Sequence, residues 1–242
     1  MSPRLKFLLF TVWMLCVQTV SFATALPVSL KIEPQQRDDY DWFARHAEVL
    51  ALHAQVKPDL VFIGDSITHQ WGGNPKSHRI TGAASWDALF AGRVVTNLGF
   101  GFDYADNAYY RVLQGELDGI SPRLILINIG TNNLGFRGDS PTACAANVAA
   151  LVALVKEKQP HAKVLLIGIY PRREPHLKDK ILQTNQLLRI EAERLQVTYA
   201  DVGQVLLGAD GLAHPDYFRD TVHPNAAGYE RLAEALRPLL DK

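Results

Sequence analysis

Short apolar runs recur along the chain, and longer stretches that mix polar and apolar residues separate them. A short apolar run bounded by proline, glycine or polar residues is typical of a strand that is buried on both faces. The sequence predicts five such strands, at residues 58–64, 94–97, 124–129, 164–169 and 197–201. The remaining patterned segments predict helices at residues 37–55, 104–117, 141–159, 176–195 and 224–240.

The alternation of strands and helices determines the expected fold class. Strand–helix–strand units are right-handed and build a parallel sheet with helices on both faces. We therefore expect an α/β fold in three layers, α/β/α, with a five-stranded parallel sheet. Residues 69–92 show no regular pattern and are expected to form a long loop, of a kind that often carries function. No repeat or linker interrupts residues 26–242, which are expected to form one domain.

The first 25 residues have the pattern of a secretory signal peptide. Arg4 and Lys6 precede an apolar run at residues 7–17, and residues 23–25 match the small-residue pattern of a cleavage site. The apolar run is too short to span a membrane as a helix, although a retained membrane anchor is the alternative. We expect residues 1–25 to be removed on export, and the protein to be secreted or periplasmic without stable insertion into a membrane.

Charge and motif content exclude several classes of protein. The chain has 25 Lys and Arg residues and 25 Asp and Glu residues. Nucleic-acid binding requires clustered basic residues, so no nucleic-acid partner is expected. The sequence has no phosphate-binding loop, and the glycine pattern that begins at Gly99 lacks the third glycine of a dinucleotide-binding motif. It also lacks the paired histidines of metallohydrolases, so we expect neither a cofactor nor a metal ion.

Polar residues and glycines follow the predicted strands at their carboxyl ends. In an open α/β sheet these ends share one edge, where ligands bind. Three of the segments expected there follow strands, and a fourth opens the C-terminal helix. The four segments are residues 64–68, 98–103, 130–133 and 220–224.

These segments supply the groups that nucleophilic catalysis requires. A serine hydroxyl becomes an effective nucleophile when a histidine accepts its proton and an acid or carbonyl group orients that histidine. Ser66 lies at a strand-to-helix transition, and His223 follows Asp220 by three residues. Asn132 offers an amide donor for negative charge that develops on a carbonyl oxygen. These residues taken alone leave two interpretations of Ser66, a catalytic nucleophile and a simple helix cap.

Four blocks in this order are similar to those of the SGNH (GDSL-type) hydrolase superfamily. The subgroup that the chain resembles most is the catalytic subunit of platelet-activating-factor acetylhydrolase with its bacterial relatives. The resemblance covers about residues 57–239 and implies a flavodoxin-like sheet and ester hydrolysis through an acyl-enzyme. The blocks are Gly64-Asp65-Ser66, Asn97-x-Gly99, Gly130-x-Asn132 and Asp220-x-x-His223.

The resemblance also implies a role for each block. Ser66 would be the nucleophile, His223 the base and later the acid, and Asp220 the residue that orients His223. Asn132 and the backbone N–H groups of Ser66 and Phe102 would form the oxyanion hole. The family usually has glycine where this chain has Phe102. Phenylalanine disfavours the positive φ that glycine allows, and its ring is expected to narrow the acyl pocket.

Three further residues are candidates for substrate contact, namely Asp65, Trp71 and Asp103. The alternative for Asp65 is a turn cap, and the alternative for Trp71 is a core position. The export signal and the narrow pocket favour small acyl esters, above all acetyl groups on a carbohydrate. A short-chain acyl phospholipid or lysophospholipid is the alternative substrate, and a catalytically silent carbohydrate-binding domain is the alternative function. Relatives in the family can dimerise, so a homodimer remains open for this chain.

Overall fold

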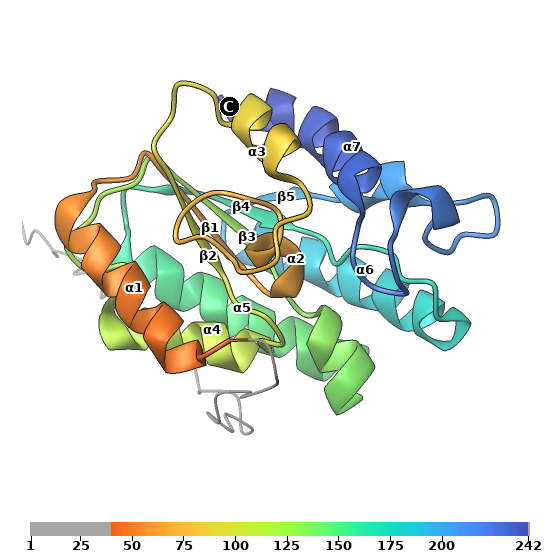
Figure 1. Ribbon diagram of the computed structural model, residues 1–242. Helices are drawn as coiled ribbons and strands as arrows, with labels where there is room; N and C mark the ends of the chain where they lie inside the picture. The colour runs from red at the N-terminus through yellow and green to blue at the C-terminus, as the bar shows by residue number, and fades with distance from the viewer. Residues whose placement is uncertain (1–39, 242) are drawn as a thin grey trace, which may run out of the picture.

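The computed structural model describes residues 40–241 and shows one sheet of five parallel strands (Figure 1). The strands are hydrogen-bonded in the order β2-β1-β3-β4-β5. The expected α/β fold with a five-stranded parallel sheet is confirmed, and each strand lies close to its predicted position. The strands are β1 (Leu60–Gly64), β2 (Val95–Gly99), β3 (Leu124–Asn128), β4 (Lys163–Ile167) and β5 (Thr198–Ala200).

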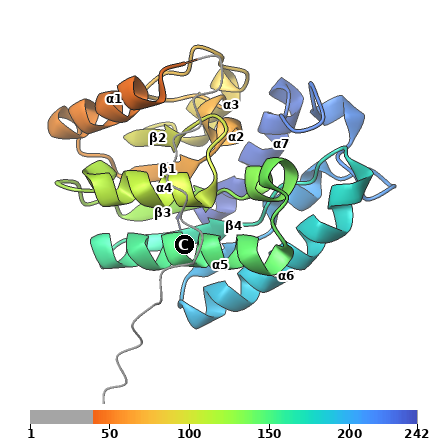
Figure 2. The same ribbon diagram turned by 90° about the horizontal axis from the view of Figure 1, so that it is seen from below.

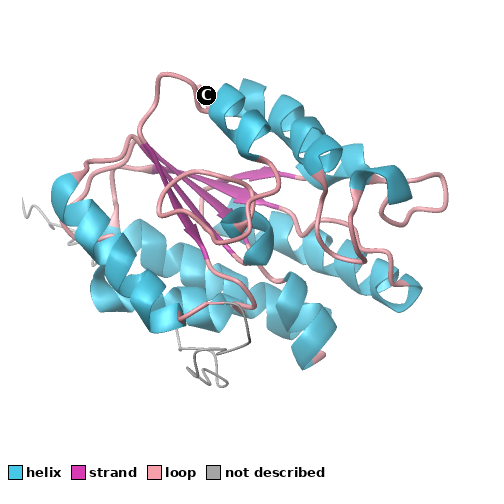
Figure 3. Ribbon diagram, in the orientation of Figure 1, coloured by secondary structure: helices cyan, strands magenta, loops and turns pink. Residues whose placement is uncertain are grey.

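Helices cover both faces of the sheet and form the outer two of three layers (Figures 1 and 3). Helices α1, α4, α5 and α6 pack against one face, which Figure 2 shows from below, and α3 and α7 pack against the other. Their bounds are α1 (Trp42–Gln55), α2 (Ser66–His69), α3 (Ala83–Leu89), α4 (Ala105–Arg111), α5 (Pro141–Lys158), α6 (Lys178–Arg194) and α7 (Ala226–Leu236).

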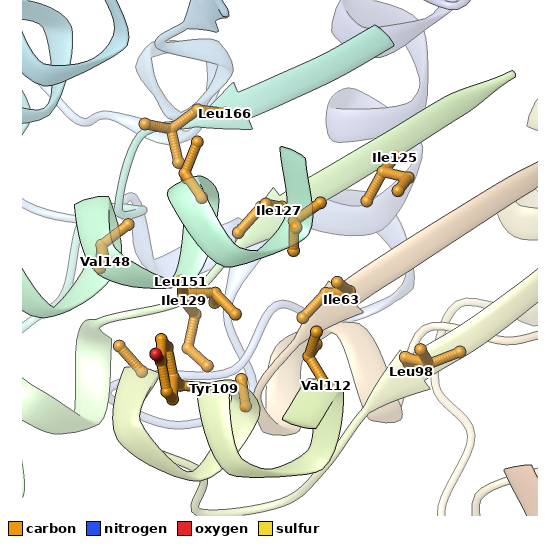
Figure 4. Packing of buried hydrophobic residues seen from close by; sticks show 14 of the residues in the cluster. Ile63, Leu98, Tyr109, Val112, Ile125, Ile127, Ile129, Val148, Leu151 and Leu166 are labelled. Atoms are coloured by element: carbon orange, nitrogen blue, oxygen red, sulfur yellow. The ribbon is translucent and has the colours of Figure 1, made fainter. Parts of the chain in front are cut away.

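The strands are apolar throughout because both of their faces are covered. Successive side chains of a strand point to opposite faces. In β1, Val61 and Ile63 belong to the core under α4 and α5, whereas Leu60 and Phe62 belong to the core under α3 and α7. Figure 4 shows the first of these two cores, where side chains of the sheet meet those of α4 and α5. The sheet residues labelled there are Ile63, Leu98, Ile125, Ile127 and Leu166.

The strand order brings the predicted functional segments together. The chain leaves β1 toward β2 on one side and later returns to pair β3 on the other side of β1. The register places Gly64, at the end of β1, between Gly99 of β2 and Asn128 of β3. Ligands of open α/β sheets bind at such a switch point, outside the carboxyl ends of the strands. The segments that follow β1, β2 and β3 therefore share this site.

The segment at residues 69–92 contains α3, a helix that the sequence pattern did not predict. Trp86 and Leu89 are the buried residues of this short helix. The Trp86 ring packs against Trp71 and Phe62, at centroid distances of 6.1 and 6.3 Å. Tertiary packing of aromatic rings therefore stabilises α3, since so short a helix is marginal on its own.

The predicted signal peptide, residues 1–25, lies outside the described residues. The first described helix, α1, begins at Trp42, and Asp41 caps it by accepting a hydrogen bond from the Ala44 N–H at 3.0 Å. Within residues 40–241, no helix has the length and apolar character needed to cross a membrane.

Candidate active site

Ser66 is the first residue of α2 and follows the carboxyl end of β1 after a single residue. That residue, Asp65, is the N-cap of α2, and its carboxylate accepts a hydrogen bond from the Ile67 N–H at 2.9 Å. The cap satisfies one of the N–H groups that a helix leaves unpaired at its start, so the chain turns here from strand to helix. Ser66 therefore lies at the edge of the sheet where the four segments meet.

His223 approaches Ser66 from the far end of the chain, 157 positions away in the sequence. Its Nε2 atom lies 2.9 Å from the Ser66 Oγ atom. On the other side of the ring, Nδ1 lies 2.8 Å from Oδ2 of Asp220 and 3.1 Å from Oδ1. A ring that donates its Nδ1–H to this carboxylate has a lone pair on Nε2 that faces the Ser66 hydroxyl. The structure therefore joins Ser66, His223 and Asp220 in one hydrogen-bonded chain.

Several donors hold Asp220 as a carboxylate. Its Oδ1 atom accepts hydrogen bonds from the backbone N–H groups of Val222 at 2.8 Å and His223 at 2.7 Å. Partial burial alone would raise the pKa of Asp220, but the hydrogen bonds from the His223 ring and from these two N–H groups outweigh it. They hold the pKa of Asp220 well below its usual range. The side chain of Asp220, rather than a main-chain carbonyl, therefore contacts Nδ1 of His223.

Helix α7 links His223 to the helix that carries Ser66. Asn225 caps α7 and accepts a hydrogen bond from the Gly228 N–H at 3.0 Å. Tyr229, in the first turn of α7, is fully buried and donates from its hydroxyl to the Ile67 carbonyl at 2.8 Å. Because Ile67 belongs to α2, this bond ties the C-terminal helix to the helix that begins with Ser66.

The donors expected for an oxyanion hole lie around one hollow. Ser66, Phe102, Asn132 and His223 all line this hollow, whose volume is about 230 Å³. The Asn132 amide donates one hydrogen to the Asp103 carbonyl at 3.0 Å, so its second hydrogen remains for a ligand. In the part of the chain that the structure describes, no protein group accepts a hydrogen bond from the N–H of Ser66 or of Phe102. All three donors are therefore available to a carbonyl oxygen in the hollow.

Phe102 adopts the backbone conformation that glycine favours. Its φ is +63°, in the left-handed region that non-glycine residues rarely occupy. Phenylalanine disfavours this φ, yet the backbone of this chain adopts it at residue 102. The Phe102 ring lies 5.8 Å from the Phe136 ring, and both residues line the hollow. An aromatic wall thus stands beside Ser66.

His69 and Tyr40 line another part of the hollow. His69 is 3% exposed, and its Nδ1 atom accepts a hydrogen bond from the Gly101 N–H at 3.2 Å. Burial, with a smaller effect from nearby Arg45, lowers the pKa of His69 to about 2, so the ring is neutral. The Tyr40 ring packs edge-on against it at 4.9 Å. Sequence reasoning missed Tyr40, which belongs to no recognisable block. For His69, three residues after Ser66, a surface position is the expectation from the sequence and a place at the site the alternative, and the structure places it in the lining.

Asp65, Trp71 and Asp103 do not line the hollow. Their exposed fractions are 1%, 0% and 0%, so a substrate in the hollow does not reach them. Trp71 donates from Nε1 to the Ser85 hydroxyl at 2.9 Å and packs on Tyr229 at 5.1 Å. The expectation that these three residues contact the substrate is therefore corrected. Asp65 caps α2, Trp71 is a core residue, and Asp103 belongs to a buried ion pair.

A buried arginine holds Asp103 in place. Arg111 is fully buried and donates from Nε to the Asp103 carboxylate at 2.9 Å and from Nη1 to Glu116. Burial would lower the pKa of Arg111, but the charges of Glu116 and Asp103 outweigh it and raise the pKa, so the guanidinium stays protonated. Trp42 donates to the same carboxylate at 2.7 Å. Sequence reasoning missed this network, although an arginine between apolar helix positions is a signal for it.

Metal-ligating side chains do not cluster near these residues. Across residues 40–241, no three His, Cys, Asp or Glu side chains lie close enough together to hold a metal ion. The thiol of Cys144 is buried and lies 3.6 Å from the Gly130 carbonyl oxygen.

Comparison with known proteins identifies the family. Residues 62–231 match the GDSL-like Lipase/Acylhydrolase family. A curated relative from Homo sapiens, the platelet-activating factor acetylhydrolase IB subunit alpha1, is 31% identical over 209 residues. The match covers 84% of this chain and 84% of the relative.

Two solved structures are similar to this one in fold. A carbohydrate acetylesterase from Sinorhizobium meliloti has a TM-score of 0.59 at 19% identity, and the match covers 76% of this chain and 99% of that chain. A variant of an acetyl-xylooligosaccharide esterase from Geobacillus has a TM-score of 0.61 at 23% identity, and the match covers 76% and 94%. Ser66, Asn132 and His223 all fall within the segment that matches the family. The chain therefore belongs to the GDSL-like lipase/acylhydrolase family, within the SGNH hydrolase superfamily, and it is a carboxylic ester hydrolase.

Proposed function

We propose that Ser66 is the nucleophile of this esterase, that His223 is its general base and acid, and that Asp220 orients the histidine. The observation that carries the proposal is the 2.9 Å contact between Ser66 Oγ and His223 Nε2. Asp220 lies 2.8 Å from the other ring nitrogen, which selects the tautomer that accepts a proton from serine. Both distances are within the hydrogen-bond reach that proton transfer requires.

The reaction then follows from the positions of these groups. Ser66 Oγ attacks the carbonyl carbon of the ester while its proton passes to Nε2 of His223. Negative charge develops on the carbonyl oxygen, and the N–H groups of Ser66 and Phe102 and the amide of Asn132 donate to it. The carbon–oxygen bond to the alcohol breaks, the alcohol leaves with the proton from His223, and an acyl-enzyme remains. Water, which His223 deprotonates, attacks the acyl carbon. The bond between that carbon and Ser66 Oγ then breaks, His223 returns the proton to Oγ, and the carboxylic acid leaves.

The acyl group in this proposal is small, above all acetyl, and a carbohydrate carries the ester. The hollow around Ser66 has a volume of about 230 Å³, and the rings of Phe102 and Phe136 take up part of its lining. The names of the two solved structures of similar fold, a carbohydrate acetylesterase and an acetyl-xylooligosaccharide esterase, support this choice. The signal peptide expected at residues 1–25 supports a secreted or periplasmic location.

A short-chain acyl phospholipid or lysophospholipid is the second candidate substrate. The curated human relative, at 31% identity, is named as a platelet-activating factor acetylhydrolase subunit, which favours this candidate. The two candidates share a small acyl group and differ in the alcohol to which it is attached.

Replacement of the nucleophile tests the catalytic assignment. Ser66→Ala should reduce the hydrolysis of p-nitrophenyl acetate to the background rate, because no other hydroxyl lies against His223 Nε2 among the described residues. Ser121→Ala, at an exposed position, is the matched control and should retain the activity of the unmodified enzyme. Steady turnover by Ser66→Ala would contradict the assignment.

A series of p-nitrophenyl esters from acetyl to decanoyl tests the size of the acyl pocket. kcat/KM should be highest for the shortest chains, because the aromatic wall of Phe102 and Phe136 limits the space beside Ser66. A maximum at chains of eight carbons or more would contradict a small acyl group. Acetate release from an acetylated xylo-oligosaccharide, compared with release from a short-chain acyl phospholipid, then distinguishes the two alcohols.

A further inference from the structure

The backbone at Phe102 belongs to a tight turn that suits glycine. The Asp103 N–H donates to the Phe100 carbonyl at 3.3 Å, so residues 100–103 form a β-turn with Gly101 and Phe102 at its centre. Phe102 has a φ of +63°, whereas Gly101 has no positive φ. A turn whose second residue has a negative φ and whose third residue has a positive φ is of type II, and its third residue is normally glycine. Phe102 therefore occupies the position in the turn that is least suited to a side chain.

The orientation of the central peptide distinguishes this turn from its common alternative. In a type I turn the third residue has a negative φ, which phenylalanine favours. Its central peptide is flipped by about 180° relative to that of a type II turn. The central peptide here joins the Gly101 carbonyl to the Phe102 N–H. A flip to type I would reverse the directions of both groups, so the Phe102 N–H would no longer point as it does now. The oxyanion donor is therefore in a conformation that its own side chain opposes.

Tyr40 contacts the central peptide directly. Its hydroxyl donates to the Gly101 carbonyl oxygen at 3.0 Å. The peptide bond between Gly101 and Phe102 is trans, so its C=O and N–H point in opposite directions. A donor that holds the carbonyl on one side thus directs the Phe102 N–H to the other side. The Gly101 N–H donates a hydrogen bond to His69 Nδ1 at 3.2 Å, which also holds the peptide between Phe100 and Gly101.

The surroundings of Tyr40 keep its hydroxyl in place as a donor. Burial, reinforced by the negative charge of Asp103, raises the pKa of Tyr40 well above its usual value, so the phenol stays protonated. Tyr40 lies just before α1, and that helix is attached to the same loop. Arg45 donates to the Gly99 carbonyl at 2.9 Å, and Trp42 donates to the Asp103 carboxylate at 2.7 Å. Contacts on both sides of the turn therefore position Tyr40.

We propose that Tyr40 is a positioning residue, which holds the Gly101–Phe102 peptide in the type II orientation so that the Phe102 N–H serves the oxyanion hole. This inference rests on the proposed function, in which Ser66 attacks an ester carbonyl. Tyr40 acts through the peptide and not on the reacting atoms. Its importance in this chain comes from Phe102, because a glycine at that position would hold the turn without help.

The proposal predicts that the effect of removing the Tyr40 hydroxyl depends on residue 102. Tyr40→Phe deletes one oxygen atom and should lower kcat for p-nitrophenyl acetate by about tenfold or more, with KM within about twofold, because an oxyanion donor acts mainly in the transition state. In a Phe102→Gly background, the same deletion should lower kcat by less than about threefold. Tyr110→Phe is the control and should leave kcat unchanged. The Tyr110 ring packs on Trp42 at 6.3 Å, and within residues 40–241 its hydroxyl makes no hydrogen bond to residues 100–103.

A second measurement separates loss of the oxyanion hole from general damage. Methylboronic acid forms a tetrahedral adduct with an active-site serine and places an oxygen where the oxyanion develops. Tyr40→Phe should weaken inhibition by methylboronic acid in proportion to the fall in kcat/KM, and the thermal midpoint of the variant is measured beside it. Should Tyr40→Phe fail to fold, recovery of the fold by adding Phe102→Gly would support the proposal, and no recovery would overturn it.

The outcomes distinguish this inference from the proposed function. An inactive Ser66→Ala together with a Tyr40→Phe variant whose kcat stays within about twofold overturns the role of Tyr40 and leaves the nucleophile intact. An equal loss of kcat with and without the Phe102→Gly substitution overturns the peptide-holding role in the same way. An active Ser66→Ala overturns the proposed function itself, and the role of Tyr40 fails with it.

Discussion

Asp65 offers a test of stability that is independent of catalysis. This carboxyl group is 1% exposed and caps α2 next to Ser66. Burial raises the pKa of Asp65 to about 7, although the hydrogen bond from the Ile67 N–H acts in the opposite direction. Asp65→Asn replaces the carboxyl group with a neutral group of the same shape, whose oxygen can still accept the Ile67 N–H. The substitution therefore removes the titration and retains the cap.

The sign and the size of the effect follow from the two pKa values of Asp65. In the unfolded chain the carboxyl releases its proton near pH 4, whereas the folded protein keeps it up to about pH 7. Between these values the folded state binds more protons, so the free energy of unfolding falls as pH rises. The slope is about 1.4 kcal/mol per pH unit, and the total loss is at most about 4 kcal/mol. Asp65→Asn should abolish this loss.

Urea unfolding followed by tryptophan fluorescence, at pH values from about 4.5 to 8, measures the difference. The stability of Asp65→Asn relative to the unmodified protein should increase steadily across this range and level off above about pH 7. Asp87→Asn, at an exposed position on α3, is the control and should follow the unmodified protein at every pH. A constant difference between Asp65→Asn and the unmodified protein across the range would refute the reasoning, since it would mean that folding does not shift the titration of Asp65.

Two further predictions concern the histidine and the core. Asp220→Asn places an amide NH₂ group opposite Nδ1 of His223, where the carboxylate oxygen now accepts the ring N–H. kcat for p-nitrophenyl acetate should therefore fall about 10²-fold or more, with KM within about twofold. An unchanged kcat in steady-state assays would show that Asp220 does not orient the ring. Trp71→Ala removes a fully buried ring that packs on Tyr229, so it should lower the free energy of unfolding by about 3–5 kcal/mol. Urea titration measures the change in the free energy of unfolding. A raised KM with unchanged stability would instead indicate that Trp71 contacts the substrate.

The residues that meet at the active site were accessible from the sequence because their placement follows from chain order. A serine directly after an apolar strand lies at the carboxyl end of that strand, and a parallel sheet brings all such ends to one edge. Ser66 and Asn132 could therefore be assigned to one site before any contact was known, whereas His223, which opens the last helix, was assigned to it with the help of the family's block order. The strands could be predicted for a similar reason, since their apolar runs are a local property of the chain.

The placements that the sequence could not provide depend on partners far away in the chain. An aspartate that pairs with a buried arginine and one that contacts a substrate have the same local pattern, so Asp103 could not be assigned without its Arg111 contact. Trp71 became a core residue only through the rings of α3 and α7, which it meets across long sequence separations. The hydroxyl of Tyr40 bonds to a carbonyl 61 positions away, and no periodicity indicates such a contact.

The hydrogen bond between Tyr229 and Ile67 has a practical consequence for handling this enzyme. It joins residues 162 positions apart, and the Ser66–His223 contact spans 157 positions beside it. A chain that is truncated or still incomplete at its C-terminal end has the proposed nucleophile, Ser66, without its proposed proton acceptor, His223. Ester turnover thus measures the fraction of molecules that have completed folding, and a simple colorimetric rate can monitor refolding yield, protease damage or storage losses.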